Sequence, residues 1–250
     1  MKMHFVSTGP KFPYSYYIGI KSASKVGEVK LWYSEEPDSS YFDEIKVEKE
    51  KIECPDFPAF KGRGDHVNRV SKFDYLIWKI VSTEGGSVMG LDSITIRPFH
   101  DLLTKEILVG RDAETVPTSY CMHGATVRKG SDLAAKIFED SQRALNKEEI
   151  KGKFTALNNG ELRFGGAGII PFLNNVLENP DKVSVADFGV LGGYMHDNSP
   201  FYLYEDSELL NPDCRTIPFY ATWQCMKFSE ISPESIKGSL LGRLVENAKI

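Results

Sequence analysis

Residues 73–92, FDYLIWKIVSTEGGSVMGLD, carry the strongest structural pattern in the chain. Apolar residues recur at helical spacing through the first part, which predicts a helix over residues 65–84. Gly85 and Gly86 then stop the helix, as a left-handed C-terminal cap would. The apolar run over residues 87–91 predicts a strand that follows directly after this short turn.

Two aspartates within this stretch are candidates for a functional site. Asp74 shares the inward face of the predicted helix with Val70 and Ile77, where an ionised carboxylate is costly unless it is paired or hydrogen-bonded. Its partner is either another protein group, in a structural salt bridge or hydrogen bond, or a ligand. Asp92 follows the predicted strand, where a carboxylate holds a metal ion or a ligand hydroxyl, or bonds its own backbone in a turn.

Strands and helices alternate along the rest of the chain. This alternation predicts an α/β fold, arranged as a single-domain α/β/α sandwich around a mostly parallel central sheet. In such sheets, ligands bind beyond the carboxyl ends of the strands. The predicted strands lie at residues 4–8, 29–33, within 45–54 and at 94–96, and the further predicted helices lie at 14–25, 131–145, 167–178 and from Pro233 to the end.

Composition narrows the functional classes. With 250 residues, 41% of them hydrophobic, the chain can form one domain with one substantial core. A formal net charge of −5 provides no basic field to hold a polyanion, which argues against non-specific nucleic-acid binding. The four cysteines form no CxxC pair and match no zinc pattern, so we expect reduced thiols. Because no signal-peptide run or apolar stretch of about 20 residues occurs, we expect a cytoplasmic protein without a transmembrane segment.

The order of features in residues 73–92 resembles the core of the DxD-containing (sugar-binding region) glycosyltransferases. This family includes initiation-type α-mannosyltransferases, capsular polysaccharide transferases and the large clostridial toxin transferases. Its members carry a helix aspartate, a helix end at Gly-Gly, a short apolar strand and then Asp-x-Asp. Asp74, Gly85, Gly86 and Asp92 stand at the corresponding positions of this chain.

The resemblance, which is good over roughly residues 4–103, implies a single GT-A domain that transfers a sugar from a UDP- or GDP-sugar with retention of configuration. Residues 1–103 would bind the nucleotide sugar, and residues 104–250 would form the acceptor side. Asp92 would hold Mn²⁺ or Mg²⁺ across the diphosphate, whose negative charge grows as the glycosidic bond breaks. Asp74 would lie near the ribose, with the first strand's end near the base. The donor-binding set implied in this way is Ser7, Thr8, Gly9, Asp74, Gly85, Gly86, Gly90, Leu91 and Asp92.

Three places depart from the family pattern. Gly90 stands at the first aspartate of Asp-x-Asp, Ile77 stands where an arginine is expected, and the late element at residues 219–223 lacks a histidine. A metal site with one carboxylate still suits Mg²⁺, which keeps several waters and relies on the substrate phosphates. Otherwise lysine, arginine or other polar side chains would neutralise the diphosphate. The catalytic candidates are Asp92, Asp206 and His123.

Weaker features each have two interpretations. The glycine-rich residues 165–168 precede a predicted helix and form either an anion-binding turn or only a tight turn. His123 lies in a predicted strand, where it either faces a cleft or is satisfied within the core. The aromatic-rich residues 201–223 form either an acceptor wall or ordinary core, and His196 lies in a loop that is a candidate lid.

Three classes of function follow from these patterns. The first is a glycosyltransferase whose acceptor is a glycan, a lipid-linked sugar, a protein or a modified nucleic-acid base. The second is a degenerate transferase that binds a nucleotide sugar or a glycan without chemistry, which Gly90 favours. The third is a hydrolase with two carboxylates, ranked last because nothing places Asp74 and Asp92 as an acid–base pair about one bond.

Overall fold

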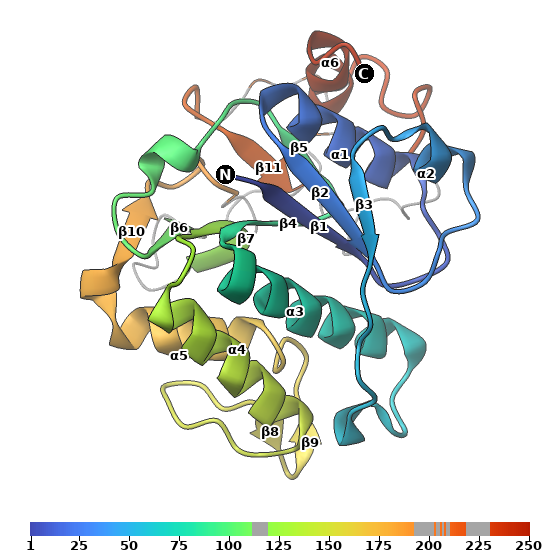
Figure 1. Ribbon diagram of the computed structural model, residues 1–250. Helices are drawn as coiled ribbons and strands as arrows, with labels where there is room; N and C mark the ends of the chain where they lie inside the picture. Colours follow the sequence, from blue (N-terminus) through green and yellow to red (C-terminus); the bar gives the residue numbers. More distant parts are fainter. Residues whose placement is uncertain (112–119, 193–202, 204–205, 207, 209–210, 219–230) are drawn as a thin grey trace.

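A seven-stranded sheet forms the centre of the molecule (Figure 1). The computed structural model describes residues 1–111, 120–192, 203, 206, 208, 211–218 and 231–250. The strand order is β10-β6-β7-β4-β1-β2-β3, in which β7 is antiparallel to both neighbours and every other pair is parallel. The strands are β1 (Met3–Ser7), β2 (Val29–Tyr33), β3 (Glu48–Lys51), β4 (Gly86–Met89), β6 (Ile107–Arg111), β7 (Tyr120–Val127) and β10 (Val183–Ala186).

Helices cover both faces of the sheet, which confirms the predicted α/β sandwich with a mostly parallel sheet. On one face α3 contacts β1 and β4, α4 packs on α3, and α5 contacts α4 and β7 (Figure 1). On the other face α1 contacts β2 and α2. This arrangement is consistent with the GT-A architecture that the resemblance implies. The helices are α1 (Tyr14–Val26), α2 (Ser40–Glu44), α3 (Asp65–Glu84), α4 (Asp132–Leu145), α5 (Ile169–Glu178) and α6 (Leu240–Asn247), with 3₁₀ turns at η1 (Pro58–Phe60), η2 (His100–Leu102) and η3 (Pro180–Lys182).

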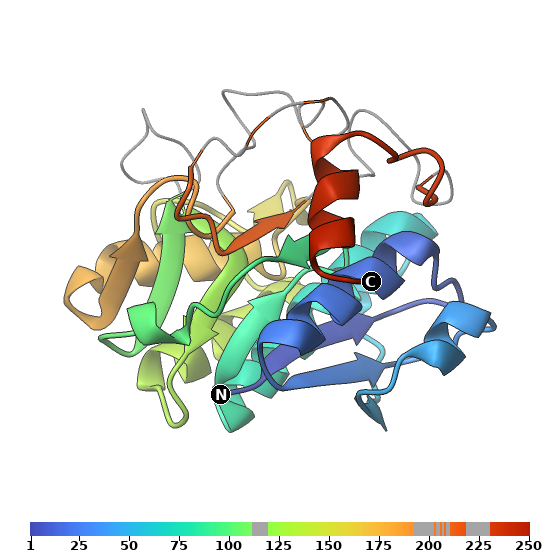
Figure 2. The same cartoon turned by 90° about the horizontal axis from the view of Figure 1, so that it is seen from above.

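A smaller layer extends the face that carries α1. Two short strands pair there as an antiparallel ribbon, and α1 packs directly on the first of them. The C-terminal helix α6 lies over α1 (Figure 2), so that Leu241 shares a buried cluster with Ile18 and Ile94. A separate hairpin of two strands, each two residues long, lies at the bottom of Figure 1, and its Leu162 shares a buried cluster with Ile137 of α4 and Phe172 of α5. These short strands are β5 (Ser93–Thr95), β11 (Thr216–Pro218), β8 (Leu157–Asn158) and β9 (Glu161–Leu162).

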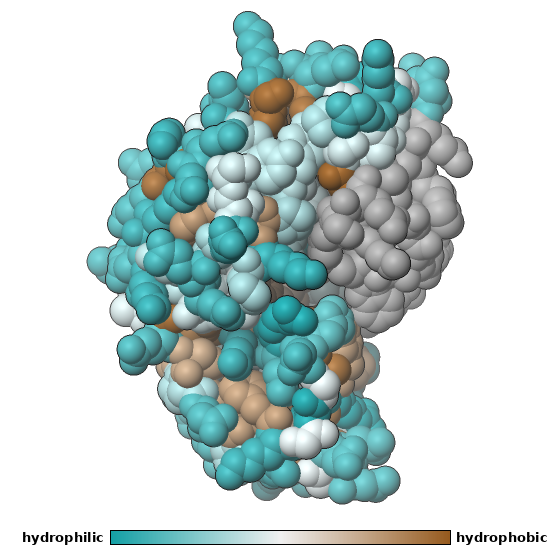
Figure 3. All heavy atoms as spheres, turned by 90° about the vertical axis from the view of Figure 1, so that its right-hand side faces the viewer, coloured by the Kyte–Doolittle hydropathy of each residue, from teal (hydrophilic) through white to brown (hydrophobic). Residues whose placement is uncertain are grey.

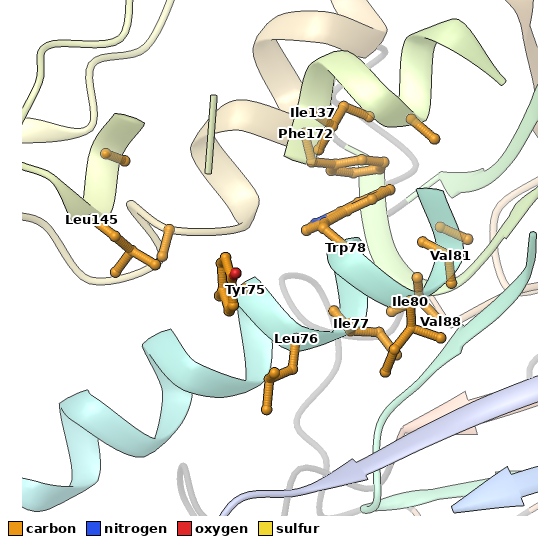
Figure 4. Close-up of a cluster of buried hydrophobic side chains, with 14 of the residues drawn as sticks. Tyr75, Leu76, Ile77, Trp78, Ile80, Val81, Val88, Ile137, Leu145 and Phe172 are labelled. Atoms are coloured by element: carbon orange, nitrogen blue, oxygen red, sulfur yellow. The ribbon is translucent and has the colours of Figure 1, made fainter. Parts of the chain in front are cut away.

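The sheet separates the buried core into two clusters, one on each face, because successive side chains of a strand point to opposite faces. Phe5 of β1 lies in the cluster beneath α1, whereas its neighbour Val6 lies in the cluster beneath α3. On the α3 side, Trp78 stacks on Phe172 of α5 with ring centroids 5.6 Å apart, and Val88 of β4 packs nearby (Figure 4). Burial of this apolar surface is the main force that holds α3 on the sheet.

The Gly85-Gly86 pair ends α3 and starts β4, as predicted. Both residues have a positive φ, 71° and 100°, and the Gly85 N–H donates to the Val81 carbonyl at 3.0 Å. A Cβ placed on Gly86 would lie 2.5 Å from the Lys2 carbonyl oxygen and 2.7 Å from the His4 ring. Only glycine therefore allows the start of β4 to approach the start of β1 this closely.

Most predicted elements are present, and the differences have physical reasons. The helix predicted over residues 65–84 has those bounds. The helix predicted from residue 167 begins at Ile169, because the preceding glycines form the turn. The strand expected within residues 45–54 is the short edge strand β3, whose side chains are exposed or half-buried charged groups. The last helix begins at Leu240, several residues after Pro233.

Figure 3 shows one face of the molecule, coloured by hydropathy. The coloured part of the face in Figure 3 is mainly hydrophilic, with apolar side chains scattered singly or in small groups. Among the helices in the described residues, none is both long and apolar enough to cross a membrane.

Candidate functional site

Two loops far apart in the sequence leave the sheet at the same edge. In the parallel sheet Ser7 pairs with Tyr33, and Phe5 of β1 pairs with Met89 of β4. The chain that follows β1 and the chain that follows β4 therefore both emerge at the carboxyl ends of these strands. Open α/β sheets in general bind ligands at this edge, so the residues of these two loops are the candidate site.

The loop after β1 packs against the first half of α3. The Thr8 hydroxyl donates to the Arg69 carbonyl at 3.2 Å, and a Cβ placed on Gly9 would lie 3.1 Å from Arg69 Cδ. The exposed Arg69 side chain thus lies across Gly9, and a larger residue there would require this side chain to move. Ser7 is 1% exposed, and its hydroxyl oxygen has no hydrogen-bond partner in the structure.

Asp74 lies midway along α3 on the side that packs against α5. The end of α3 lies at the amino end of β4, and the helix runs back along β4 and β1. Asp74 is half of this 20-residue helix from that end, about 15 Å, which is close to the length of β1. Asp74 therefore lies near the level of the carboxyl edge. Its side chain is buried, and Oδ2 has no hydrogen-bond partner. Burial raises the pKa of Asp74 to about 7. The sequence analysis predicts that this carboxylate has a protein or ligand partner, and no described protein group forms a hydrogen bond with Oδ2.

The contact between Asp74 and Gly168 is very close. A Cβ placed on Gly168 would lie 2.4 Å from Asp74 Cγ and 2.7 Å from Oδ1. One helical turn further on, Trp78 of α3 stacks on Phe172 of α5 (Figure 4), so α3 meets the start of α5 at two successive places. The glycine-rich turn at residues 165–168 therefore has a packing role, since it lets α5 approach the carboxylate.

The turn after β4 is held by a chain of hydrogen bonds. The Gly90 N–H donates to His123 Nδ1 at 3.1 Å, and His123 Nε2 lies 3.0 Å from the Thr216 hydroxyl oxygen. The Thr216 hydroxyl donates to the Ile94 carbonyl at 3.2 Å, and the Ser93 hydroxyl donates to the Gly90 carbonyl at 2.7 Å. Burial lowers the pKa of His123 to about 4, so the ring is neutral at physiological pH.

Asp92 lies within this turn, beside the glycine that replaces the first aspartate of Asp-x-Asp. A Cβ placed on Gly90 would lie 2.9 Å from Asp92 Oδ1 and 3.4 Å from His123 Nδ1. Burial raises the pKa of Asp92 to about 6, partly opposed by a hydrogen bond from its own backbone. The Asp92 carboxyl group therefore fills the space into which a side chain at residue 90 would project.

Two further residues at this edge were not predicted. Burial, followed by the charge of Asp92, raises the pKa of Tyr16, whereas the charge of Arg69 lowers it. Tyr16 of α1 is therefore within electrostatic range of Arg69 on α3 and of Asp92 in the turn after β4. These three elements meet at this edge of the sheet. No spacing signal marks either Arg69 or Tyr16 in the sequence, because their proximity depends on how the helices pack.

Other predicted residues lie elsewhere. Gly85 and Gly86 lie at the amino end of β4, so a ligand at the carboxyl edge would be separated from them by the length of that strand. Their positive φ angles and close packing explain these glycines without a ligand. Asp206 is exposed and forms an ion pair with Arg243 of α6. The Leu91 carbonyl packs closely against Gly19, so the turn after β4 rests on α1.

Several predicted residues fall outside the described part of the chain. These are the candidate lid residue His196, the late element at residues 219–223 and all the aromatic residues of the expected acceptor wall. Of that wall region, Leu203 is described and is buried in the cluster with α6.

A closed metal site is not formed by the described residues. Within residues 1–111, 120–192 and the shorter described segments, no three His, Cys, Asp or Glu side chains gather in a way that would hold a metal ion. His123 Nδ1 already accepts a hydrogen bond from Gly90. Asp92 thus offers a single carboxylate, which fits a cation only if the ligand's phosphates and water complete its coordination.

Known proteins resemble this chain in structure, whereas the comparisons by sequence find no match. No protein-family model matches the chain, and no curated protein matches it in sequence. Among solved structures, the chain is similar to one titled "PaToxG Glycosyltransferase", with a TM-score of 0.46 and 14% sequence identity over 71% of this chain and 67% of that one. A likeness of this degree does not assign an activity.

Proposed function

We propose that this protein transfers a sugar from a UDP- or GDP-sugar to an acceptor and that the donor binds at the carboxyl edge of the sheet. The observation that carries the proposal is a pair of buried polar atoms at this edge, Ser7 Oγ and Asp74 Oδ2, without hydrogen-bond partners. A buried polar atom without a partner costs about 1–3 kcal/mol, which a ligand with matching hydroxyl groups would recover. Asp92 adds a carboxylate at the same edge.

The donor's nucleoside would lie over the end of β1 and the middle of α3. Asp74 would accept hydrogen bonds from the ribose hydroxyls, because a carboxylate has acceptor positions for two of them. Ser7 and Thr8 would face the base. The Thr8 hydroxyl donates its proton to the Arg69 carbonyl and so keeps its acceptor lone pairs for a base N–H.

The diphosphate would lie between Arg69 and Asp92. Arg69 extends across Gly9 and shares its electrostatic surroundings with Tyr16 and Asp92. A guanidinium group binds phosphate oxygens in a bidentate manner, so Arg69 would supply the positive charge that the family pattern expects from residue 77. Asp92, ionised above a pKa of about 6, would bind Mn²⁺ or Mg²⁺ carried by the diphosphate.

The reaction would break the bond between the sugar's anomeric carbon and the diphosphate oxygen. The electron pair passes to the diphosphate, and the acceptor oxygen forms a new bond to the anomeric carbon as it loses its proton. A divalent cation would stabilise the leaving diphosphate. The role of this chain's own residues is to orient the donor and to place positive charge beside the leaving group.

A second candidate function is a binding module that recognises a nucleotide sugar without turnover. It is favoured by Gly90, because the Asp92 carboxyl group and the His123 ring occupy the space of the missing aspartate. The two candidates share the donor site and differ only in whether the bound donor reacts.

The test is a panel of UDP- and GDP-sugars incubated with the protein in Mn²⁺ or Mg²⁺, with donor binding and the release of free nucleotide measured separately. We expect hydrolysis of at least one donor, lost in Asp92→Asn and kept in the matched control Asp181→Asn, whose side chain is exposed in η3. Binding without nucleotide release would favour the binding module. The absence of both for every donor would refute the donor site.

A further inference from the structure

His123 joins three separate parts of the fold. Its ring lies on β7, its Nδ1 accepts from the Gly90 N–H in the turn after β4, and its Nε2 contacts Thr216 on β11. The Thr216 hydroxyl in turn bonds to the carbonyl of Ile94, two residues after Asp92. The chain of hydrogen bonds therefore begins on one side of Asp92 and returns to the other.

The proton positions in this chain follow from its donors. Because the Gly90 N–H can only donate, Nδ1 of His123 carries no proton, and the neutral ring must carry its proton on Nε2. That N–H donates to the Thr216 oxygen, whose own hydroxyl proton goes to Ile94. Every polar group in the chain is satisfied in one arrangement.

The glycine at residue 90 belongs to the same arrangement. A Cβ at this position would press on both Asp92 Oδ1 and His123 Nδ1, at 2.9 and 3.4 Å. The His123 ring and the Asp92 carboxyl group can therefore occupy their positions only because residue 90 has no side chain. An aspartate at residue 90 would have to displace Asp92, the ring or both.

We propose that His123 and Thr216 are positioning residues that fix the turn at residues 90–92 and thereby aim the Asp92 carboxylate at the donor. This proposal rests on the proposed function, because it gives His123 the task of holding the site and no contact with the donor. Thr216 belongs to β11, in the acceptor-side part of the chain, so the hydrogen bonds also join that part to the donor site.

The hydrogen-bond chain is tested without any ligand by nitrogen-15 NMR of the imidazole rings, with the His123→Asn variant used to assign the His123 signals. We expect the neutral ring with its proton on Nε2 and no titration between about pH 5 and pH 8. A proton on Nδ1, or titration near the ordinary histidine pKa of about 6.5, would overturn the proposal.

The positioning role is tested by pairs of variants measured for donor binding and hydrolysis. His123→Leu and Thr216→Val remove hydrogen-bonding atoms, and we expect each to weaken donor use by about tenfold, since a buried N–H or hydroxyl loses its partner. His123→Asn keeps an acceptor for the Gly90 N–H, and Thr216→Ser keeps the hydroxyl, so both should restore most of the activity.

Equal loss in His123→Asn and His123→Leu would show that the imidazole itself contacts the donor, and wild-type behaviour in all four variants would show that the turn needs no support. Either result overturns the positioning role. If the wild-type protein neither binds nor hydrolyses any donor, the proposed function fails, whereas the NMR measurement still decides whether the hydrogen-bond chain exists. Circular dichroism of each variant separates loss of function from loss of folding.

Discussion

At the scale of single residues, the neighbouring sequence predicted where the carboxylates of Asp74 and Asp92 lie in the fold. Asp74 stands among apolar residues with helical spacing, and the structure buries it to 3% exposure. Asp92 follows an apolar strand, and the structure places it in the turn after β4. Arg69 was not predictable, because its place across Gly9 depends on the packing of α3 against the loop after β1.

The raised pKa of Asp74 makes the stability of the protein depend on pH. Between the unfolded pKa of 3.8 and the folded pKa of about 7, the native state binds more protons than the unfolded state, so stability falls as pH rises. Asp74→Asn stays neutral and lacks this loss. Across the two units from about pH 5 to about pH 7, at about 1.4 kcal/mol per unit, the variant should gain about 3 kcal/mol relative to wild type.

Urea unfolding at pH 5 and pH 8 measures this difference. Other titrating groups are common to both proteins and cancel, and Asp181→Asn, whose side chain is exposed, provides the control. A difference between wild type and Asp74→Asn that does not change with pH would show that Asp74 ionises freely in the folded protein.

Arg69 is expected to bind the donor's phosphates. Arg69→Gln should weaken the binding of UDP or GDP about tenfold, close to 1.4 kcal/mol, because a charge-assisted hydrogen bond is lost. Arg97→Gln makes the same change of charge at an exposed side chain and should bind as the wild type does. Titration calorimetry at two salt concentrations measures both. Equal nucleotide affinity in the two variants would remove Arg69 from the site.

At the scale of elements, local patterns predicted α3 in full because its signals are all in the sequence. The apolar spacing marks the extent of the helix, and the two glycines after Glu84 mark its end. The pairing of β11 with β5 was not predictable, because a short strand carries little periodicity and its partner lies far away in the sequence. The same holds for the antiparallel direction of β7, which places His123 beside Gly90.

The close approach of α3 and α5 depends on Gly168. Gly168→Ala would place a Cβ 2.4 Å from Asp74 Cγ, so one helix must shift, and we expect a loss of about 1–3 kcal/mol in the free energy of unfolding. Gly64→Ala is the matched control, because nothing lies within 4 Å of its Cβ position and its φ is −66°. Its cost should stay below about 1 kcal/mol. Equal costs for the two variants would contradict the contact.

At the scale of the whole molecule, one sheet unites the two parts that the sequence distinguished. Strands β6, β7 and β10 come from residues 104–250 and continue the sheet formed by the first 103 residues. His123 on β7 and Thr216 on β11 thus meet the turn that holds Asp92, which the sequence assigned to the donor side. The expectation that a ligand binds beyond the carboxyl ends of the strands follows from the α/β pattern alone, whereas the contacts among these residues depend on this long-range pairing.

The central claim is that a nucleotide sugar binds at the carboxyl edge of the sheet. A crystal structure of the protein with UDP or GDP and Mn²⁺ tests it most directly. We predict that the ribose hydroxyls bond to Asp74, that the diphosphate lies between Arg69 and Asp92, and that Gly85 and Gly86 do not contact the nucleotide. A nucleotide bound at another place, or no bound nucleotide at millimolar concentration, would contradict the account.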